Sequence, residues 1–128
     1  MKREESEEGI LETWTPDEVQ AAFDANEVAL IDVRTPQEFM FEHIGGALLL
    51  PLSFFDASKL PSQTGKRIVF HCGSGIRSEK VARAALAAGF GTVAHLEGGF
   101  AAWKAAGKPY TGTDMATGAP IKVAAATT

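Results

Sequence analysis

The chain has 128 residues, of which 45% are hydrophobic and 22% are charged, as in an ordinary globular protein. This length suits one domain that buries its own core without disulfide staples. The 12 basic and 16 acidic residues give a formal net charge of −4, which argues against nucleic acid or an anionic membrane as the main partner. A single cysteine excludes an internal disulfide, so nothing points to an oxidising compartment.

The two ends of the chain differ in composition from the part between them. Residues 1–9 are acidic and polar and predict a flexible tail, whereas residues 10–110 are predicted to form the domain. Residues 111–128 are rich in Thr, Ala and Gly and form an extension, in which residues 120–123 can dock as an extra strand. The first eight residues lack the apolar segment of a secretory signal, and the apolar runs are too short to span a bilayer. We therefore expect a cytoplasmic protein with no membrane partner.

The first predicted helix has a defined start. Thr15 is suited to the N-cap, Pro16 to the first helical position, and Glu18 completes a capping box. Val19 and Phe23 then recur at helical spacing, which gives the segment one apolar face. The sequence therefore predicts an amphipathic helix that begins directly after Thr15.

Downstream of this helix, apolar and often β-branched runs alternate with segments of helical spacing that glycine or proline ends. The predicted strands are residues 28–33, 47–50, 67–71 and 92–96. The predicted helices are residues 36–41, 53–60, 78–88 and 100–106. This alternation predicts an α/β fold, with a central parallel β-sheet and helices on both faces. Ligands of such sheets bind beyond the carboxyl ends of the strands, where Asp32, Arg34 and Cys72 stand.

The loop after the third predicted strand carries the strongest chemical signal. Gly73 and Gly75 let the backbone curl so that several N–H groups point inward and form an anion-binding nest. The helix that begins near Ser78 adds its positive end, and Arg77 adds a full positive charge. This field favours a thiolate at Cys72, the reactive nucleophile, with a pKa below the free value of about 8.5. The predicted binding loop comprises Gly73, Ser74, Gly75, Ile76, Arg77 and Ser78.

Two other interpretations of Cys72 are open from the residues alone. A lone cysteine after a strand is often a small buried hydrophobe, but that role needs no glycines, arginine and helix start around it. Cysteine phosphatases place five residues between their cysteine and arginine, whereas four residues separate Cys72 from Arg77 here. The smaller ring of N–H groups suits a terminal sulfur better than a phosphoryl group. A phosphatase or an arsenate reductase is therefore the less favoured hypothesis.

At these residues the chain resembles the rhodanese (sulfurtransferase) family. The matching pieces appear in the family's order over residues 14–107: Asp32-Val33-Arg34 with Glu38-Phe39, His43-Ile44 to Gly46-Ala47, Cys72-Gly73-Ser74-Gly75-Ile76-Arg77-Ser78, and Leu96-Glu97-Gly98-Gly99-Phe100 with Trp103. The resemblance implies a rhodanese-like α/β fold and ping-pong chemistry, in which sulfane sulfur passes from a donor to Cys72 and then to cyanide or a thiol. It implies that loop N–H groups stabilise the persulfide, and that no metal or organic cofactor takes part.

The departures from the family's pattern bear on the sulfur donor. Members specialised for thiosulfate resemble this chain less, because they carry basic residues where it has Gly73, Ser74 and Glu38. The opening Cys72-Gly73-Ser74-Gly75 looks more like the mercaptopyruvate branch. Thiosulfate, 3-mercaptopyruvate and a partner protein's persulfide all stay open as donors. A protein-fed sulfur carrier with little turnover of free donors is the alternative to an enzyme, since both need a reactive Cys72.

The remaining polar residues have a structural and a functional interpretation each. Asp32 and Arg34 can orient the loop or contact substrate, or they can form a structural ion pair, with Arg34 tied to Asp32 or Glu38. His43 is predicted to be a hydrogen-bonded structural histidine at a turn, and His95 lies within a predicted strand without an identifiable partner. No cluster of His, Cys or carboxylate residues shows ligand spacing, so no metal site is predicted.

Overall fold

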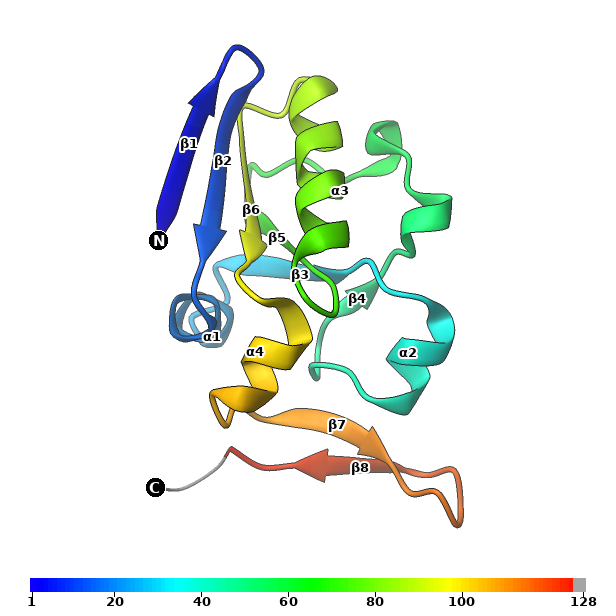
Figure 1. Cartoon of the computed structure of the whole chain (residues 1–128). Helices are drawn as coiled ribbons and strands as arrows, with labels where there is room; N and C mark the ends of the chain where they lie inside the picture. Colours follow the sequence, from blue (N-terminus) through cyan, green and yellow to red (C-terminus); the bar gives the residue numbers. More distant parts are fainter. Residues whose placement is uncertain (126–128) are drawn as a thin grey trace.

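The computed structural model describes residues 1–125 and contains one six-stranded sheet with helices around it (Figure 1). The strands of this sheet are β1 (Lys2–Ser6), β2 (Gly9–Trp14), β3 (Val28–Asp32), β4 (Leu48–Leu49), β5 (Arg67–His71) and β6 (Thr92–Leu96). The helices are α1 (Pro16–Asp24), α2 (Pro36–Phe41), α3 (Ile76–Ala87), α4 (Gly99–Ala105) and two 3₁₀ segments, Leu52–Phe54 and Ala57–Lys59. A second sheet pairs β7 (Tyr110–Thr113) with β8 (Pro120–Val123).

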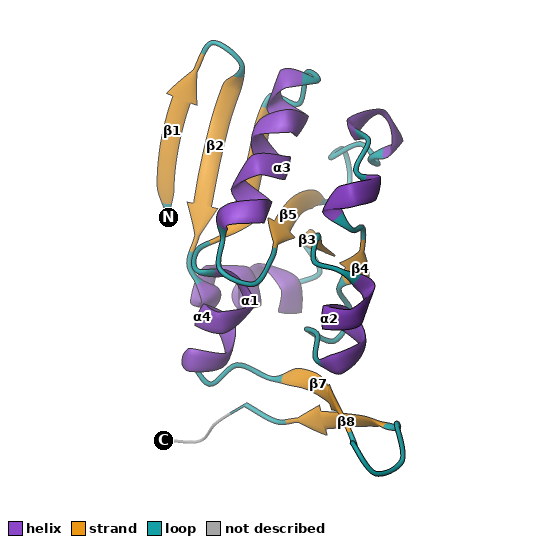
Figure 2. Cartoon of the chain, turned by 45° about the vertical axis from the view of Figure 1, so that its right-hand side comes forward, coloured by secondary structure: helices purple, strands orange, loops and turns teal. Residues whose placement is uncertain are grey.

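The central sheet is mostly parallel, as the alternation of strands and helices predicted. Its order is β1-β2-β6-β5-β3-β4, and every neighbouring pair is parallel except β1 with β2. Parallel neighbours need crossover connections, and the helices that supply them cover both faces of the sheet (Figure 2). The predicted α/β class with helices on both faces is therefore confirmed.

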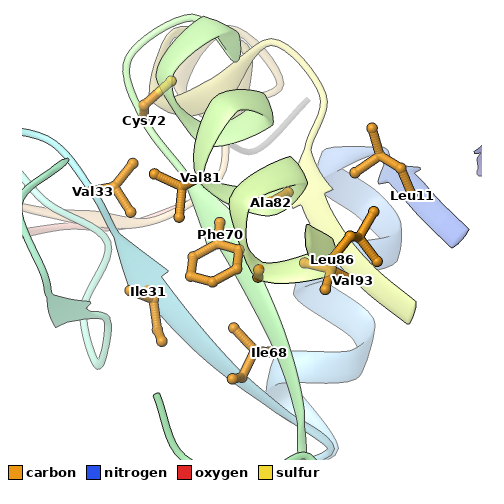
Figure 3. Close-up of a cluster of buried hydrophobic side chains, with 11 residues drawn as sticks. Leu11, Ile31, Val33, Ile68, Phe70, Cys72, Val81, Ala82, Leu86 and Val93 are labelled. Carbon is orange, nitrogen blue, oxygen red and sulfur yellow. The ribbon is translucent and has the colours of Figure 1, made fainter. Parts of the chain in front are cut away.

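Two hydrophobic clusters lie on opposite faces of the sheet. Along β5, Ile68 and Phe70 pack with Val81 of α3, whereas Val69 packs on the other face with Val19 of α1 and residues of α4. This alternation follows from the period of two along a strand. Figure 3 shows Cys72 at the end of the first cluster, with its sulfur pointing away from the other side chains. Strand β5 thus places Cys72 at the point where the packed core meets the loop that follows the strand.

The prediction that residues 1–9 form a flexible tail is wrong. Residues 2–6 form β1, which pairs antiparallel with β2, a strand that the sequence analysis did not predict. All five side chains of β1 are exposed, so no hydrophobic pattern marks the strand. Its stability comes from backbone pairing and from ion pairs such as Lys2–Glu97 at 2.9 Å and Arg3–Glu12 at 3.2 Å. β2 itself is held by its parallel pairing with β6 and by the buried side chain of Leu11.

The segment after β4 and the C-terminal extension also differ from their predictions. In place of one helix over residues 53–60 there are two 3₁₀ segments. The Asp56 carboxylate accepts the Ser58 N–H, so Asp56 caps the start of a second segment and does not continue the first. Residues 120–123 form a strand as predicted, but it pairs with β7 and not with the central sheet. This hairpin is tied to the domain by reciprocal backbone hydrogen bonds between His43 and Thr111, at 2.8 and 2.7 Å. Residues 126–128 of the extension lie outside the described part.

The helix boundaries follow the sequence signals closely. α1 begins after Thr15 with both hydrogen bonds of the predicted capping box present. α2 begins with a second capping box, formed by Thr35 and Glu38. α3 begins at Ile76, two residues before its predicted start, because Gly75 at a φ of 106° serves as its N-cap. Within residues 1–125, no helix has the length and hydropathy required to cross a bilayer.

Candidate active site

The first residues of α4 hydrogen-bond to the backbone of the loop that follows β5. The carbonyl oxygen of Cys72 accepts the Phe100 N–H at 2.8 Å, and that of Gly73 accepts the Ala101 N–H at 3.0 Å. Gly99 lies directly against the loop backbone at a φ of 61°, and a Cβ there would approach the Cys72 oxygen to 2.5 Å. These two hydrogen bonds, and the close approach that the missing Cβ of Gly99 permits, hold the backbone of Cys72 in one position.

The sulfur of Cys72 takes the place of a capping side chain at the N-terminus of α3. Its Sγ accepts the Gly75 N–H at 3.1 Å and the Ser78 N–H at 3.3 Å. Gly75 carries no capping side chain, so these backbone donors are free to face the sulfur. The hydroxyl oxygen of Ser78 lies 3.6 Å from Sγ. The inward-pointing N–H groups that the sequence predicts around Cys72 are present in the loop.

The electrostatics of the site favour a thiolate. Burial alone would raise the pKa of Cys72, whose side chain is fully buried. The hydrogen bonds from Ser78, Ser74 and Gly75 outweigh burial and lower the pKa of Cys72 below its ordinary value. Arrangements that lower a thiol pKa in this way are typical of reactive cysteines.

Arg77 does not direct its charge at the sulfur. Its two terminal nitrogens donate to the two carboxylate oxygens of Glu38, at 2.7 and 3.0 Å. The predicted role of Arg77 as the positive charge that lowers the Cys72 pKa is thereby weakened, since a carboxylate neutralises that charge locally. The hydrogen bonds from Arg77, together with those from Thr35, lower the pKa of Glu38 to about 2. The same pairing raises the pKa of Arg77.

The Glu38–Arg77 pair is expected to make stability depend on pH below neutrality. Because the folded-state pKa of Glu38 is depressed, the stabilisation is present above its unfolded value of 4.5 and is lost as pH falls towards about 2. Both side chains are about one third exposed, so screening keeps the effect small. Urea unfolding at about pH 7 and about pH 3 is expected to show a smaller acid-induced loss in Glu38→Gln than in the wild type. Equal losses would contradict this pairing.

Asp32 and Arg34 form a buried ion pair beside the loop. Arg34 donates to both carboxylate oxygens of Asp32 at 2.8 to 3.1 Å and also to the backbone oxygen of Glu42 at 2.7 Å. The guanidinium also stacks over the ring of Phe100, 4.6 Å from its centroid. Of the two pairings considered for Arg34, the structure has the one with Asp32. A buried pair of this kind fixes geometry more than it adds stability.

The histidines occupy three different environments. His43 bonds the Phe39 carbonyl oxygen through Nδ1 at 2.8 Å and stacks on the Phe39 ring, which agrees with a structural role at a turn. His71 is fully buried next to Asp32, and burial lowers its pKa. His95 lies beside Ser78, with its Nδ1 3.0 Å from the Ser78 hydroxyl. No sequence signal placed His95 in the site, because the pairing depends on how α3 crosses β6.

Two hollows flank the loop. One, of about 260 Å³, is lined by Val33, Arg34, Thr35, Pro51, Leu52, Ser53 and Arg77. The other, of about 440 Å³, is lined by Lys2, Thr13, Ser74, Gly75, Ile76, Glu79, His95, Glu97 and Gly98. A more apolar hollow of about 370 Å³ lies between α1 and the β7–β8 hairpin and contains no loop residue. Among residues 1–125, no three metal-ligating side chains come together. The two hollows thus border residues 74–77 of the loop, and Cys72 itself lines neither of them.

Comparison with known proteins identifies the family to which this parallel α/β domain, with a cysteine held by backbone amides at a strand end, belongs. The family model described as "Rhodanese-like domain" matches residues 15–106. The chain therefore belongs to the rhodanese-like family. The match covers every element from α1 to α4 and includes the whole cysteine loop.

Individual relatives carry different descriptions. An uncharacterized protein from Synechocystis is 41% identical over 111 residues, which are 87% of this chain, and the matched part spans 60% of that relative's length. A protein named "Sulfurtransferase" from Allochromatium vinosum is 33% identical over 90 residues, covering 70% of this chain and 84% of its own. A solved structure from Rhodopseudomonas palustris, described as a "possible tyrosine phosphatase", superposes with a TM-score of 0.67 at 31% identity, covering 76% of this chain and 82% of its own.

Proposed function

We propose that the protein is a sulfurtransferase that carries sulfane sulfur as a persulfide on Cys72. The observation that supports this most directly is the position of Sγ at the N-terminus of α3, where Gly75 and Ser78 donate N–H groups to it. These donors stabilise negative charge on whichever sulfur lies there. Membership in the rhodanese-like family and the sulfurtransferase relative support the same chemistry. The reaction needs no metal or organic cofactor.

The transfer consists of two displacements. In the first, the Cys72 thiolate attacks the transferable sulfur of the donor, a new S–S bond forms, and the donor's bond to that sulfur breaks. The electron pair leaves with the donor, as sulfite from thiosulfate, as a thiolate from a persulfide, or as the pyruvate enolate from 3-mercaptopyruvate, which then takes up a proton. In the second, cyanide or a thiolate attacks the outer sulfur, and Cys72 departs as a thiolate. The outer sulfur of a persulfide lies about 2.05 Å from Sγ. The loop amides therefore face negative charge both before and after each step.

The charge at the loop bears on the donor. Arg77 is the one basic residue of the loop from Cys72 to Ser78, and Glu38 holds its guanidinium through two hydrogen bonds. A dianion such as thiosulfate meets little free positive charge there. This favours a persulfide presented by a partner protein, or 3-mercaptopyruvate, over thiosulfate. The acceptor is a thiol or cyanide, and the proposed setting is the cytoplasm.

Intact-mass measurement tests the proposal directly. The purified protein is incubated separately with thiosulfate, with 3-mercaptopyruvate and with glutathione persulfide, and its mass is recorded before and after cyanide is added. We expect the gain of one sulfur atom, its removal by cyanide, and the release of thiocyanate. The rank order of donors by loading rate identifies the preferred class. A protein that gains no sulfur from any donor, and whose thiol does not react with iodoacetamide, would contradict the proposal.

The full burial of Cys72 favours a second candidate, a protein-fed sulfur carrier. Free donors must reach a sulfur that the loop covers, whereas a docked partner can displace the loop as it delivers its persulfide. Slow turnover with free donors and fast transfer from a partner persulfide would distinguish the carrier from the enzyme.

A phosphatase role, suggested by the Rhodopseudomonas relative, is less favoured. The loop holds four residues between Cys72 and Arg77, one fewer than phosphatases use, and Arg77 is held by Glu38. We expect no hydrolysis of p-nitrophenyl phosphate.

A further inference from the structure

A chain of hydrogen bonds leads from Cys72 through the interior to strand β2. The Ser78 hydroxyl lies 3.6 Å from the Cys72 Sγ and 3.0 Å from Nδ1 of His95. The other ring nitrogen of His95, Nε2, lies 3.1 Å from the hydroxyl oxygen of Thr13. Ser78 is fully buried and His95 is only 4% exposed, so these groups bond to one another in place of water. Three elements, α3, β6 and β2, thus supply one connected path.

The path has the donor and acceptor order that proton transfer needs. A neutral imidazole carries one N–H and one lone pair. When Nε2 carries the hydrogen and donates it to Thr13, the lone pair of Nδ1 faces the Ser78 hydroxyl. The Ser78 oxygen lies 3.2 Å from the Gly75 carbonyl oxygen and 3.0 Å from Nδ1, so its hydrogen has two acceptors and the path uses the second. Burial lowers the pKa of His95, which favours the neutral ring that presents this lone pair. The Ser78 hydroxyl can then receive one proton and release another.

We propose that Ser78 and His95 form the proton path of Cys72. The Sγ–H bond breaks as its proton binds Ser78 Oγ, and the original hydroxyl proton of Ser78 passes to Nδ1 of His95. Ser78 is unchanged at the end, and the products are a Cys72 thiolate and a His95 imidazolium. Ser78 contacts the reacting sulfur, whereas His95 acts through Ser78 as a positioning residue. The inference rests on the proposed function only in taking Cys72 as the reacting group.

Burial and the charges around His95 together determine how readily the imidazolium forms. Burial has the largest effect and opposes the imidazolium, as does Arg83 of α3, whereas Glu79 of α3 and Glu97 after β6 favour it. Arg83 is held by Glu79 at 3.2 Å and by Glu4 at 2.7 Å, which offsets its charge. Lys2 of β1 lines the same hollow as His95 and is paired with Glu97 at 2.9 Å. From β2 the imidazole meets the neutral hydroxyl of Thr13.

The rate of Cys72 alkylation by iodoacetamide as a function of pH tests the path without any sulfur donor. His95→Asn keeps an amide near the position of Nδ1 but cannot accept the proton. We expect the apparent pKa of the thiol to rise by about one unit, so that alkylation below that pKa slows about tenfold. Ser78→Ala is expected to shift the profile similarly, and the double variant no further, because the two residues act in series. An unchanged profile in His95→Asn would overturn the inference.

Two further measurements keep the test specific. His43→Asn changes a histidine that bonds a backbone carbonyl away from the loop, and its alkylation profile is expected to match the wild type. If His95→Asn does not fold, the ring ¹⁵N shifts of His95 can be titrated in the wild type and in Cys72→Ser. A His95 pKa that is the same in both would also reject the path. Normal alkylation without sulfur loading would reject the proposed function and leave this inference standing.

Discussion

Cys72→Ser is expected to abolish sulfur loading while the fold stays intact. The serine hydroxyl can accept the N–H groups that Gly75 and Ser78 donate to Sγ, so the start of α3 keeps its cap. A hydroxyl of ordinary pKa neither attacks sulfane sulfur at neutral pH nor forms a persulfide. Loading and thiocyanate formation should fall by more than about a thousandfold, to background, as expected for loss of a covalent nucleophile.

Intact mass and thiocyanate release measure the chemistry of Cys72→Ser, and thermal unfolding measures its fold. The substitution replaces a fully buried sulfur with a smaller, more polar oxygen, so a loss of about 1–2 kcal/mol is expected. A cooperative transition whose midpoint lies within about 10 °C of the wild type shows that the missing activity is chemical. If Cys72→Ser still gained sulfur, the persulfide would lie on another group, and the proposed function would be wrong.

Gly99→Ala is expected to damage both stability and sulfur loading. Gly99 has a φ of 61°, which costs a residue with a Cβ about 1–2 kcal/mol. Its Cβ would also come within 2.5 Å of the Cys72 oxygen and 2.7 Å of the Ser74 nitrogen, both backbone atoms. The cysteine loop must then shift, which misplaces the N–H donors around Sγ. We expect a loss of more than about 3 kcal/mol and at least about tenfold slower loading.

Gly89→Ala separates the cost of a positive φ from the cost of the Cβ contact with the cysteine loop. Gly89 has a φ of 108°, but a Cβ added there would have no other atom of residues 1–125 within 4 Å, and Gly89 follows α3 at the end away from the cysteine. Gly89→Ala should therefore lose at least about 1–2 kcal/mol from backbone strain alone and load sulfur normally. Urea unfolding and loading rates compare the two variants. Equal behaviour of Gly99→Ala and Gly89→Ala would show that the contact between α4 and the loop does not position Cys72.

The sequence predicts most of the fold because its signals are local. Thr15 with Glu18 marks the start of α1 through a capping box, and four apolar runs mark β3, β4, β5 and β6. β1 escaped prediction because all of its side chains face solvent, so its strand conformation depends on a partner rather than on a hydrophobic period. The 3₁₀ segments were missed because the Asp56 side chain competes with helical hydrogen bonds.

In the candidate site, too, the features formed by neighbouring residues were predictable from the sequence, and those formed by distant residues were not. The amides around Cys72 follow from two glycines and a helix start, which are neighbours in the chain, so the nest was predictable. The partner of Arg77 was not, because Glu38 lies 39 positions away and meets it only when α2 and α3 approach one another. His95 likewise reaches Ser78 across 17 positions, through the packing of α3 on the sheet. Local sequence thus predicts the amides around Cys72, whereas tertiary packing determines which side chains contact Arg77 and Ser78.

The two edges of the central sheet affect how the chain behaves among its own copies. One edge is β1, whose residues Lys2 to Ser6 present charged and polar side chains to solvent, and the opposite edge is β4, only two residues long. An incoming strand would find mixed charges at the first edge and too few amides at the second. Intermolecular strand pairing is therefore disfavoured at both edges of the central sheet.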